Sequence, residues 1–255
     1  MMRFARVEYK RMPDTQMKYL DLTLPTPQEN LACDEALLDL CENGGGDELL
    51  RFWEPREYFV VLGYANKAQS EAKLEACREA NLPVLRRCSG GGAVVQGAGC
   101  LNYSLFLRIT ETGPLQSITE TNCFIMKRQQ EALQNLFGGQ IIVQGVTDLT
   151  IDGLKFSGNA QRRKREFLLF HGTFLLDFNL DLIERLLPMP SQQPAYRNAR
   201  QHVDFVTNLS VPASAIKQSL ARAWNATESA KPLPNDKIDE LVTEKYSKQA
   251  WNFKF

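Results

Sequence analysis

The order of hydrophobic and polar positions predicts several helices, two of which begin with a recognisable cap. In the first, Thr26-Pro27 is followed by Glu29, and in the second Ser117 is followed by Glu120. A hydroxyl N-cap with a glutamate three positions later is typical of a capping box, and proline suits the first helical turn. Both helices are expected to end at glycine runs, residues 44–46 and 138–139. Helical composition predicts further helices at residues 67–80, 180–187, 213–224 and 236–246.

Short apolar runs between turn-forming residues predict strands. Residues Leu49–Trp53 and 58–62, with Pro55 between them, are expected to form a hairpin. Residues 101–105 alternate large apolar with small polar side chains, which predicts a strand with one buried face. Further strands are predicted at residues 83–87, 140–143, 148–151 and 167–178. Because strands and helices mix without regular βα alternation, the predicted fold class is α+β, a central mixed β-sheet flanked by helices.

Composition excludes several classes of function. The 255 residues contain 30 Lys and Arg against 30 Asp and Glu, and this neutral balance argues against a protein that mainly binds nucleic acid. No apolar run approaches the roughly 20 residues that cross a bilayer, and the charged N-terminus does not resemble a secretory signal. The six cysteines form no CxxC pair, which disfavours a zinc or redox dithiol site and predicts a reducing compartment, the cytoplasm. Two histidines are too few for a histidine cluster.

The strongest local feature joins two arginines to three glycines, in the run Arg86-Arg87-Cys88-Ser89-Gly90-Gly91-Gly92. Glycine permits positive φ and close approach of a ligand, so successive backbone N–H groups can converge on an anion. An adjacent arginine adds a charge that suits phosphate or carboxylate. Three glycines are also typical of a flexible turn, and the other glycine run, 44–46, is interpreted in that way because it follows a helix.

Lys155 is the second candidate, because it follows a tight turn predicted at residues 152–153. A single lysine is usually a solvated surface charge, but the small residues of the 157–160 run leave room beside this amine. His171, in an apolar strand, fits either a binding residue or a hydrogen-bonded core residue. The basic run 162–165 is expected at a hairpin tip, with at least three of its four charges in solvent.

In this order the motifs closely resemble those of the lipoate–protein ligase family, part of a wider group of biotin and lipoate ligases and octanoyltransferases. They are RRCSGGGAV, LNYS, DLTIDGLKFSGNAQ and HGT, and the resemblance extends from about Leu31 to the KYSKQAWNF tail. It implies a mixed sheet with flanking helices, in which the Gly-rich loop and the lysine bind an acyl-adenylate beside an apolar acyl tunnel. It also implies that residues 1–255 form a single catalytic domain, without the C-terminal accessory domain of longer ligases.

The resemblance implies individual roles as well. Lys155 matches the lysine that contacts the acyl carbonyl and the α-phosphate, and is the expected catalytic residue. Trp53 and Gly63 match the strand pair beside the acyl tunnel. The positions expected to bind acyl-AMP or ATP are Arg87, Ser89, Gly90, Gly91, Gly92, Ala93, Val94, Val95, Asn102, Asp148, Ser157, Gly158, Ala160, Arg162, His171, Gly172 and Thr173. No metal-ligating residue is implied.

The expected activity has two steps: lipoate or octanoate reacts with ATP and Mg²⁺ to give acyl-AMP, and the acyl group then passes to a lysine of a lipoyl-carrier domain. Two alternatives stay open, a transferase that works without ATP and a ligase subunit that needs a separate accessory protein. Octanoyltransferases use a cysteine nucleophile, in one branch upstream of the lysine block, where residues 143–147 contain none. Cys123 lies in a predicted helix, and Gln96 stands where many ligases have histidine. The carrier, the preferred acyl chain and the oligomeric state are not predicted.

Overall fold

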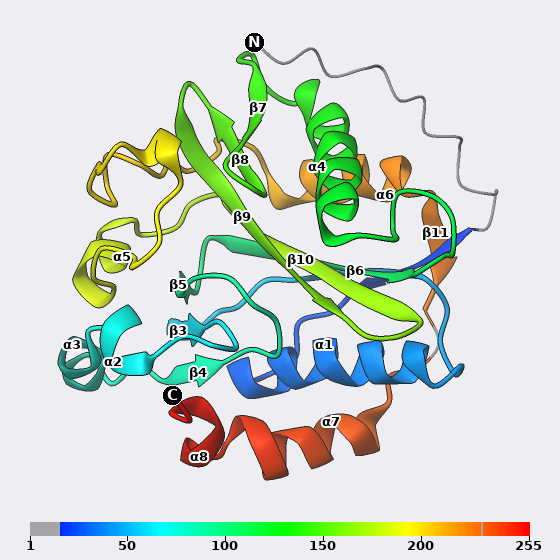
Figure 1. The fold of residues 1–255 in the computed structure, drawn as a ribbon, viewed down its shortest axis with the longest axis horizontal. Coiled ribbons are helices and arrows are strands. Elements are labelled where there is room, and N and C mark those ends of the chain that lie inside the picture. The colour runs from blue at the N-terminus through cyan, green and yellow to red at the C-terminus, as the bar shows by residue number, and fades with distance from the viewer. Residues whose placement is uncertain (1–15, 231) are drawn as a thin grey trace.

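A large mixed sheet forms the centre of the computed structural model, which describes residues 16–230 and 232–255 (Figure 1). Strand β1 pairs in parallel with both of its neighbours, and the remaining pairs of this sheet are antiparallel. In spatial order its strands are β11 (Ala226–Ser229), β1 (Met17–Asp21), β2 (Leu49–Trp53), β6 (Cys100–Arg108), β10 (Phe167–Leu175), β9 (Leu154–Arg163), β8 (Asp148–Ile151) and β7 (Ile141–Gln144). The predicted α+β class with a central mixed sheet is confirmed.

A second, three-stranded sheet contains β4 (Val84–Arg86), β3 (Phe59–Leu62) and β5 (Val94–Gln96). The predicted hairpin of β2 and β3 is therefore wrong, because the two strands belong to different sheets. Every residue of both strands is buried, so neither run carries the alternation that would assign its faces and partners. The segment around Pro55 carries the chain from one sheet to the other.

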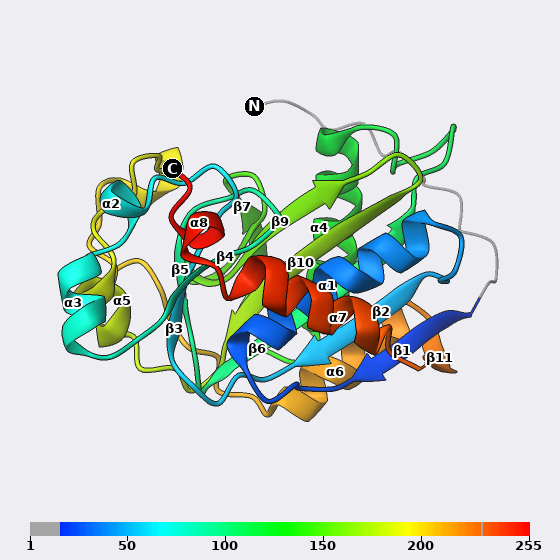
Figure 2. The ribbon, with the colours of Figure 1, turned by 90° about the horizontal axis from the view of Figure 1, so that it is seen from below.

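Helices cover both faces of the large sheet (Figures 1 and 2). Helices α4 (Ile118–Gln134) and α6 (Ala213–Ala223) pack on one face over a core that includes Leu105, Phe156 and Phe174. Helix α1 (Pro27–Glu42) covers the other face, and α7 (Asn235–Leu241) packs against α1. The smaller helices are α2 (Ala68–Glu71), α3 (Leu74–Glu79), α5 (Asp181–Leu186) and α8 (Gln249–Asn252). No helix in the described ranges is long and apolar enough to span a membrane.

The predicted helix caps are present, one of them in full. Thr26 accepts a hydrogen bond from the backbone N–H of Glu29, whose carboxylate accepts from the backbone N–H of Thr26. Ser117 caps α4 in the same way, but the Glu120 carboxylate accepts from the Ser117 hydroxyl rather than from its backbone. Both helices thus begin where the sequence predicts.

Several predicted boundaries are wrong. Residues 67–80 form two short helices, α2 and α3, and residues 236–246 form α7 followed by a π-helix at Val242–Tyr246. Strands β1, β5 and β11 were not predicted, because runs of three to five residues give a weak periodic signal.

Strand β6 is buried on both faces, which corrects the prediction of one buried face. Leu101, Tyr103, Leu105 and Leu107 face the core under α4, whereas Ser104 and Phe106 lie beneath α1. There Ser104 donates a 2.8 Å hydrogen bond to Asp34, which also forms a 2.5 Å ion pair with the fully buried Arg51. A polar face remains buried in this sheet because its groups satisfy one another.

This buried pair generates a prediction about stability. Asp34→Ala should lower the free energy of unfolding by about 3–5 kcal/mol, because the Arg51 guanidinium stays buried without its counter-charge. Asp39→Ala removes a half-exposed pair with Lys164 and, as the matched control, should cost at most about 1 kcal/mol. Urea unfolding followed by circular dichroism measures both, and equal losses would contradict the prediction.

Candidate active site

The Gly-rich loop, residues 89–93, leaves β4 and is held in shape by Arg87. The buried guanidinium of Arg87 donates hydrogen bonds to the carbonyls of Gly90 (2.6 Å) and Gly92 (2.9 Å). In a trans peptide the N–H points opposite to the C=O, so these bonds turn the N–H groups of Gly91 and Ala93 away from Arg87. All three glycines are exposed. Arg87 therefore binds the loop itself and not an exposed anion site, and the convergence of the N–H groups on an anion stays a prediction.

Gly63 and Gly91 allow the loop to approach its neighbours closely. A Cβ on Gly63 would lie 2.0 Å from the carbonyl oxygen of Gly91, and Gly91 has a φ of +87° that favours glycine. A Cβ built on Gly91 would lie 3.5 Å from the side chain of Ala160 on β9. The loop therefore lies between the end of β3 and the middle of β9.

His171 supports the loop from β10. Its Nε2 atom lies 2.5 Å from the Ser89 hydroxyl, and Ser89 is fully buried. Burial and the nearby Arg87 charge lower the pKa of His171 to about 4. The imidazole is therefore neutral at pH 7 and serves as a hydrogen-bond partner, which agrees with the core-residue interpretation while placing it at the loop.

Lys155 follows a tight turn, as predicted. Asp152 and Gly153 have φ values of 51° and 77°, and they join β8 to β9 as a hairpin. The Lys155 ammonium lies 2.7 Å from the Asp148 carboxylate, with both side chains partly exposed. A Cβ on Gly158 would lie 2.9 Å from Nζ of Lys155, so glycine at this position leaves the room that the ammonium occupies.

A β-bulge places Lys155 above Gly158. Leu149 pairs with Ser157 whereas the next residue, Thr150, pairs with Lys155, so Phe156 is an extra residue in β9. In a regular strand, residues three apart point to opposite faces of the sheet. The bulge instead brings Lys155 to the face that also carries Ala160 and the Gly-rich loop.

The lysine and the loop lie close together along this face. Gly158 pairs with Thr173 and Ala160 with His171, and two residues along a strand span roughly 7 Å. Beneath them lies a buried polar network in which Gln96 donates to Thr173 (2.6 Å) and Asn102 donates to Gln96 (3.0 Å). Gln96, at the position where many family members have histidine, is thus part of the buried polar network beneath the site.

The remaining predicted positions divide between this face and the opposite one. Trp53 pairs with Asn102, so both lie on the lysine face, and its buried Nε1 has no hydrogen-bond partner among the described residues. Ser157 pairs with Phe174, whose ring belongs to the core under α4. Gly172 packs against Asn159 on that same side. Any ligand contact from Ser157 or Gly172 would therefore come from the backbone.

Three further predicted binding positions, Val94, Val95 and Arg162, differ in how far they are exposed to solvent. Val94 is half-exposed, and Val95 is buried in the core of the small sheet. Arg162 is exposed and lies 5.6 Å from the ring of Tyr64. Of the two arginines predicted to bind the ligand, Arg162 is therefore exposed and Arg87 is buried.

The segment 195–207 completes the surroundings of Lys155, and the sequence did not predict it. Tyr196 donates a 2.7 Å hydrogen bond to Asp148, and burial together with that carboxylate raises the pKa of Tyr196. The backbone of Lys155 bonds to Phe205 and Thr207, each at 2.9 Å. These residues carry no motif, since they reach the site only through tertiary packing.

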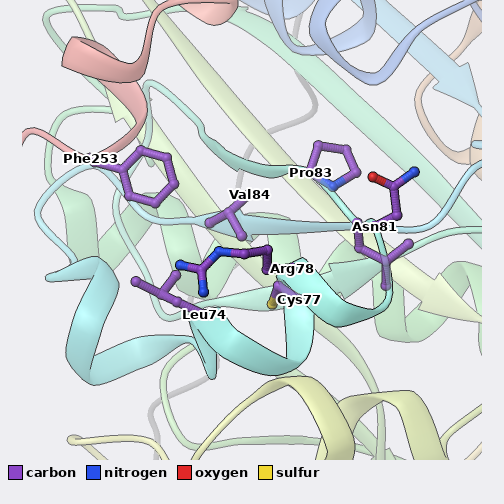
Figure 3. A pocket seen from close by; sticks show the side chains of 8 residues that line it. Leu74, Cys77, Arg78, Asn81, Pro83, Val84 and Phe253 are labelled. Atoms are coloured by element: carbon purple, nitrogen blue, oxygen red, sulfur yellow. The ribbon is translucent and has the colours of Figure 1, made fainter.

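Neither a metal cluster nor the larger open cavity coincides with this site. Within the described residues, no three His, Cys, Asp or Glu side chains gather to hold a metal ion. A cavity of about 470 Å³ opens between α3, the following turn and Phe253 (Figure 3). Its lining includes no predicted site residue. The acyl tunnel therefore stays a prediction.

The fold and the site together define a class of protein. Residues 26–223 match the model of the lipoyl protein ligase A/B catalytic domain, and the chain belongs to this family of lipoyl- and octanoyl-transferring enzymes.

Two relatives represent its two branches. The octanoyltransferase LipM of Brevibacillus brevis is 26% identical over 94% of this chain and 99% of its own length. A probable lipoate-protein ligase A of Mycoplasma pneumoniae is also 26% identical over 94% of this chain, which covers 72% of that protein.

Solved structures agree on the fold. A bipartite lipoate protein ligase of Thermoplasma acidophilum superposes with a TM-score of 0.79 at 23% identity, over 93% of this chain and 96% of that one. A lipoate-protein ligase A bound with ATP gives 0.77 at 23% identity, over 94% and 99%. These similarities confirm the architecture and carry no residue roles.

The Gly-rich loop generates a second prediction. Gly91→Val should remove binding of acyl-AMP, because a side chain at φ +87° strains the backbone and a Cβ would lie 2.8 Å from the Arg87 guanidinium. Gly138→Val is the matched control, because a Cβ there meets no atom within 4 Å and its φ is not positive. Calorimetric titration with a non-hydrolysable acyl-AMP analogue measures both. Wild-type affinity in a folded Gly91→Val protein would identify the loop as a simple turn.

Proposed function

We propose that this protein joins lipoate or octanoate to a lysine of a lipoyl-carrier domain through an acyl-adenylate. Two features support a reaction at a phosphate and a carbonyl: the loop N–H groups of Gly91 and Ala93, and the ammonium of Lys155 above Gly158, two residues along β9 from the Ala160 that adjoins the loop. In many enzymes, fixed hydrogen-bond donors that face the negative charge developing in the transition state make the largest contribution to the rate enhancement.

The observation that carries the adenylate route is the position of the cysteines. Cys33, Cys41 and Cys88 are buried in the core under α1, where burial raises the pKa of Cys88 to about 12. Cys77 and Cys100 lie in the core of the small sheet. An acyl-cysteine enzyme needs a thiolate beside its acyl-binding groups. Cys123 is exposed, but it lies on α4, which covers the face opposite to Lys155.

The two steps follow from this arrangement. A carboxylate oxygen of the acid attacks the α-phosphorus of ATP, and the bond to the bridging oxygen breaks as pyrophosphate leaves. The carrier amine then attacks the acyl carbonyl, AMP leaves with the bonding electrons, and the nitrogen releases a proton. Lys155 is placed to stabilise the charge on phosphate and carbonyl in both steps, while Asp148 and Tyr196 orient its ammonium.

A Mg²⁺ ion that accompanies ATP would lower the charge on the phosphates. With no cluster of three ligands among the described residues, phosphate oxygens would supply most of its ligands. Asp148 is the carboxylate nearest to Lys155 and is suited to add one more.

The second candidate is an octanoyltransferase that takes its acyl group from a carrier and uses no ATP. The names of several relatives favour it, since four octanoyltransferases are 23–28% identical over 98–99% of their own length. A separate accessory protein is a further possibility, for which the description of the Thermoplasma ligase as bipartite is the precedent.

Lys155→Ala should slow both half-reactions by about 10²–10³, because one donor aimed at developing charge is lost. Lys155→Arg should restore only part of the rate, since a planar guanidinium does not replace a compact ammonium. Lys127→Ala, an exposed lysine of α4, is the charge-matched control. Mass spectrometry of a carrier domain incubated with lipoate and Mg-ATP, or with lipoyl-AMP, reports each half-reaction. Normal transfer from lipoyl-AMP by Lys155→Ala would refute the proposed site.

The cysteines separate the two candidates. Replacing Cys88, Cys100 or Cys123 by serine should leave acyl transfer within about tenfold of wild type, allowing for packing losses. Incubation with an octanoylated carrier and no ATP should give no octanoyl adduct on the enzyme. A hydroxylamine-sensitive adduct on a cysteine, seen by intact mass spectrometry, would replace the ligase by the transferase.

A further inference from the structure

The last seven residues pack against β4 and the turn after β3, although they lie outside the stretch that matches the family model. Arg86 anchors them: its buried guanidinium donates to the carbonyls of Trp251 (3.1 Å) and Asn252 (2.9 Å). The same guanidinium donates to the carbonyls of Gly63 (2.8 Å) and Tyr64 (3.0 Å). One side chain therefore fixes the C-terminal segment, near β4 in Figure 1, against the turn that contacts the loop.

This anchoring places Lys254 against the ring of Tyr64, which Arg162 also contacts. The Lys254 ammonium lies 3.9 Å from the centroid of the Tyr64 ring, and the Arg162 guanidinium lies 5.6 Å from the same ring. The backbone N–H of Tyr64 donates a 2.8 Å hydrogen bond to the Ser89 carbonyl. Arg162 lies two residues beyond Ala160 on β9, and thus on the face that carries the Gly-rich loop.

The two cations have no acidic partner in the described part of the chain, where no carboxylate lies within 4 Å of either. The nearby Lys245 differs, because it is paired with Glu35 at 2.7 Å. Both charges act on Tyr64, whose pKa is lowered mainly by Lys254 and further by Arg162. The surface around Tyr64 therefore carries the positive charges of Lys254 and Arg162 without a paired carboxylate among the described residues.

We propose that Lys254 and Arg162 form a subsite for the terminal diphosphate of a nucleoside triphosphate. This inference rests on the proposed adenylate chemistry and adds the C-terminal segment to it. The two cations lie near the loop whose N–H groups face outward, so one polyphosphate chain can contact the loop and the cations together. A ligand with several negative charges gains the most binding energy from two cations. A nucleoside monophosphate does not reach the subsite.

The test compares Lys254→Ala with Lys248→Ala, which removes the same charge from an exposed lysine directly before the segment. Calorimetry on the full chain with ATP, AMP and inorganic triphosphate measures affinity without turnover. Lys254→Ala should weaken ATP and triphosphate about tenfold and AMP less than twofold, and Lys254→Arg should restore most of the loss. Single-turnover transfer from preformed lipoyl-AMP should keep its wild-type rate, and Lys248→Ala should match wild type throughout.

Equal weakening of ATP and AMP, or no change in either, would overturn the subsite. A raised KM for the carrier domain with unchanged ATP affinity would also overturn it, because Lys254 would then be a docking residue. If wild type binds triphosphate in a Lys254-dependent manner but forms no acyl-AMP, the subsite stands and the proposed ligase function fails.

Discussion

The arrangement of the site depends on two adjacent arginines that bind backbone carbonyls. Arg87 draws in the carbonyls of Gly90 and Gly92, which turns the N–H groups of Gly91 and Ala93 outward. Arg86 binds the turn at Gly63 and the chain near Asn252. Each guanidinium is buried and replaces its lost hydration by several charge-assisted hydrogen bonds, so these contacts define one loop geometry.

The β-bulge at Phe156 has a comparable effect on Lys155. In a regular strand without the bulge, Lys155 and Gly158, three residues apart, would lie on opposite faces of β9, and the ammonium would point into the core under α4. The bulge reverses this and leaves Phe156 in that core. The bulged backbone at this position therefore decides whether a lysine three residues before Gly158 faces the loop.

The family comprises enzymes that differ in how the acyl group is activated, and the positions of the thiols bear on this difference. The cysteines of this chain serve as small core residues, apart from Cys123 on the outer side of α4. A fold shared by ligases and transferases does not decide the chemistry, because function depends on which side chains reach the site. Here the groups that reach it are an ammonium, a carboxylate and backbone N–H donors.

The sequence by itself determined the local features: the cap at Thr26, the turn at residues 152–153 and the Gly-rich loop, because each depends on neighbouring residues only. It also indicated the family, since motif order survives where overall identity is low. Tertiary structure alone decided that β2 and β3 belong to different sheets and that Tyr196 and Lys254 lie near the site. Those contacts join residues far apart in the chain, and no local pattern encodes which fully buried strand pairs with which.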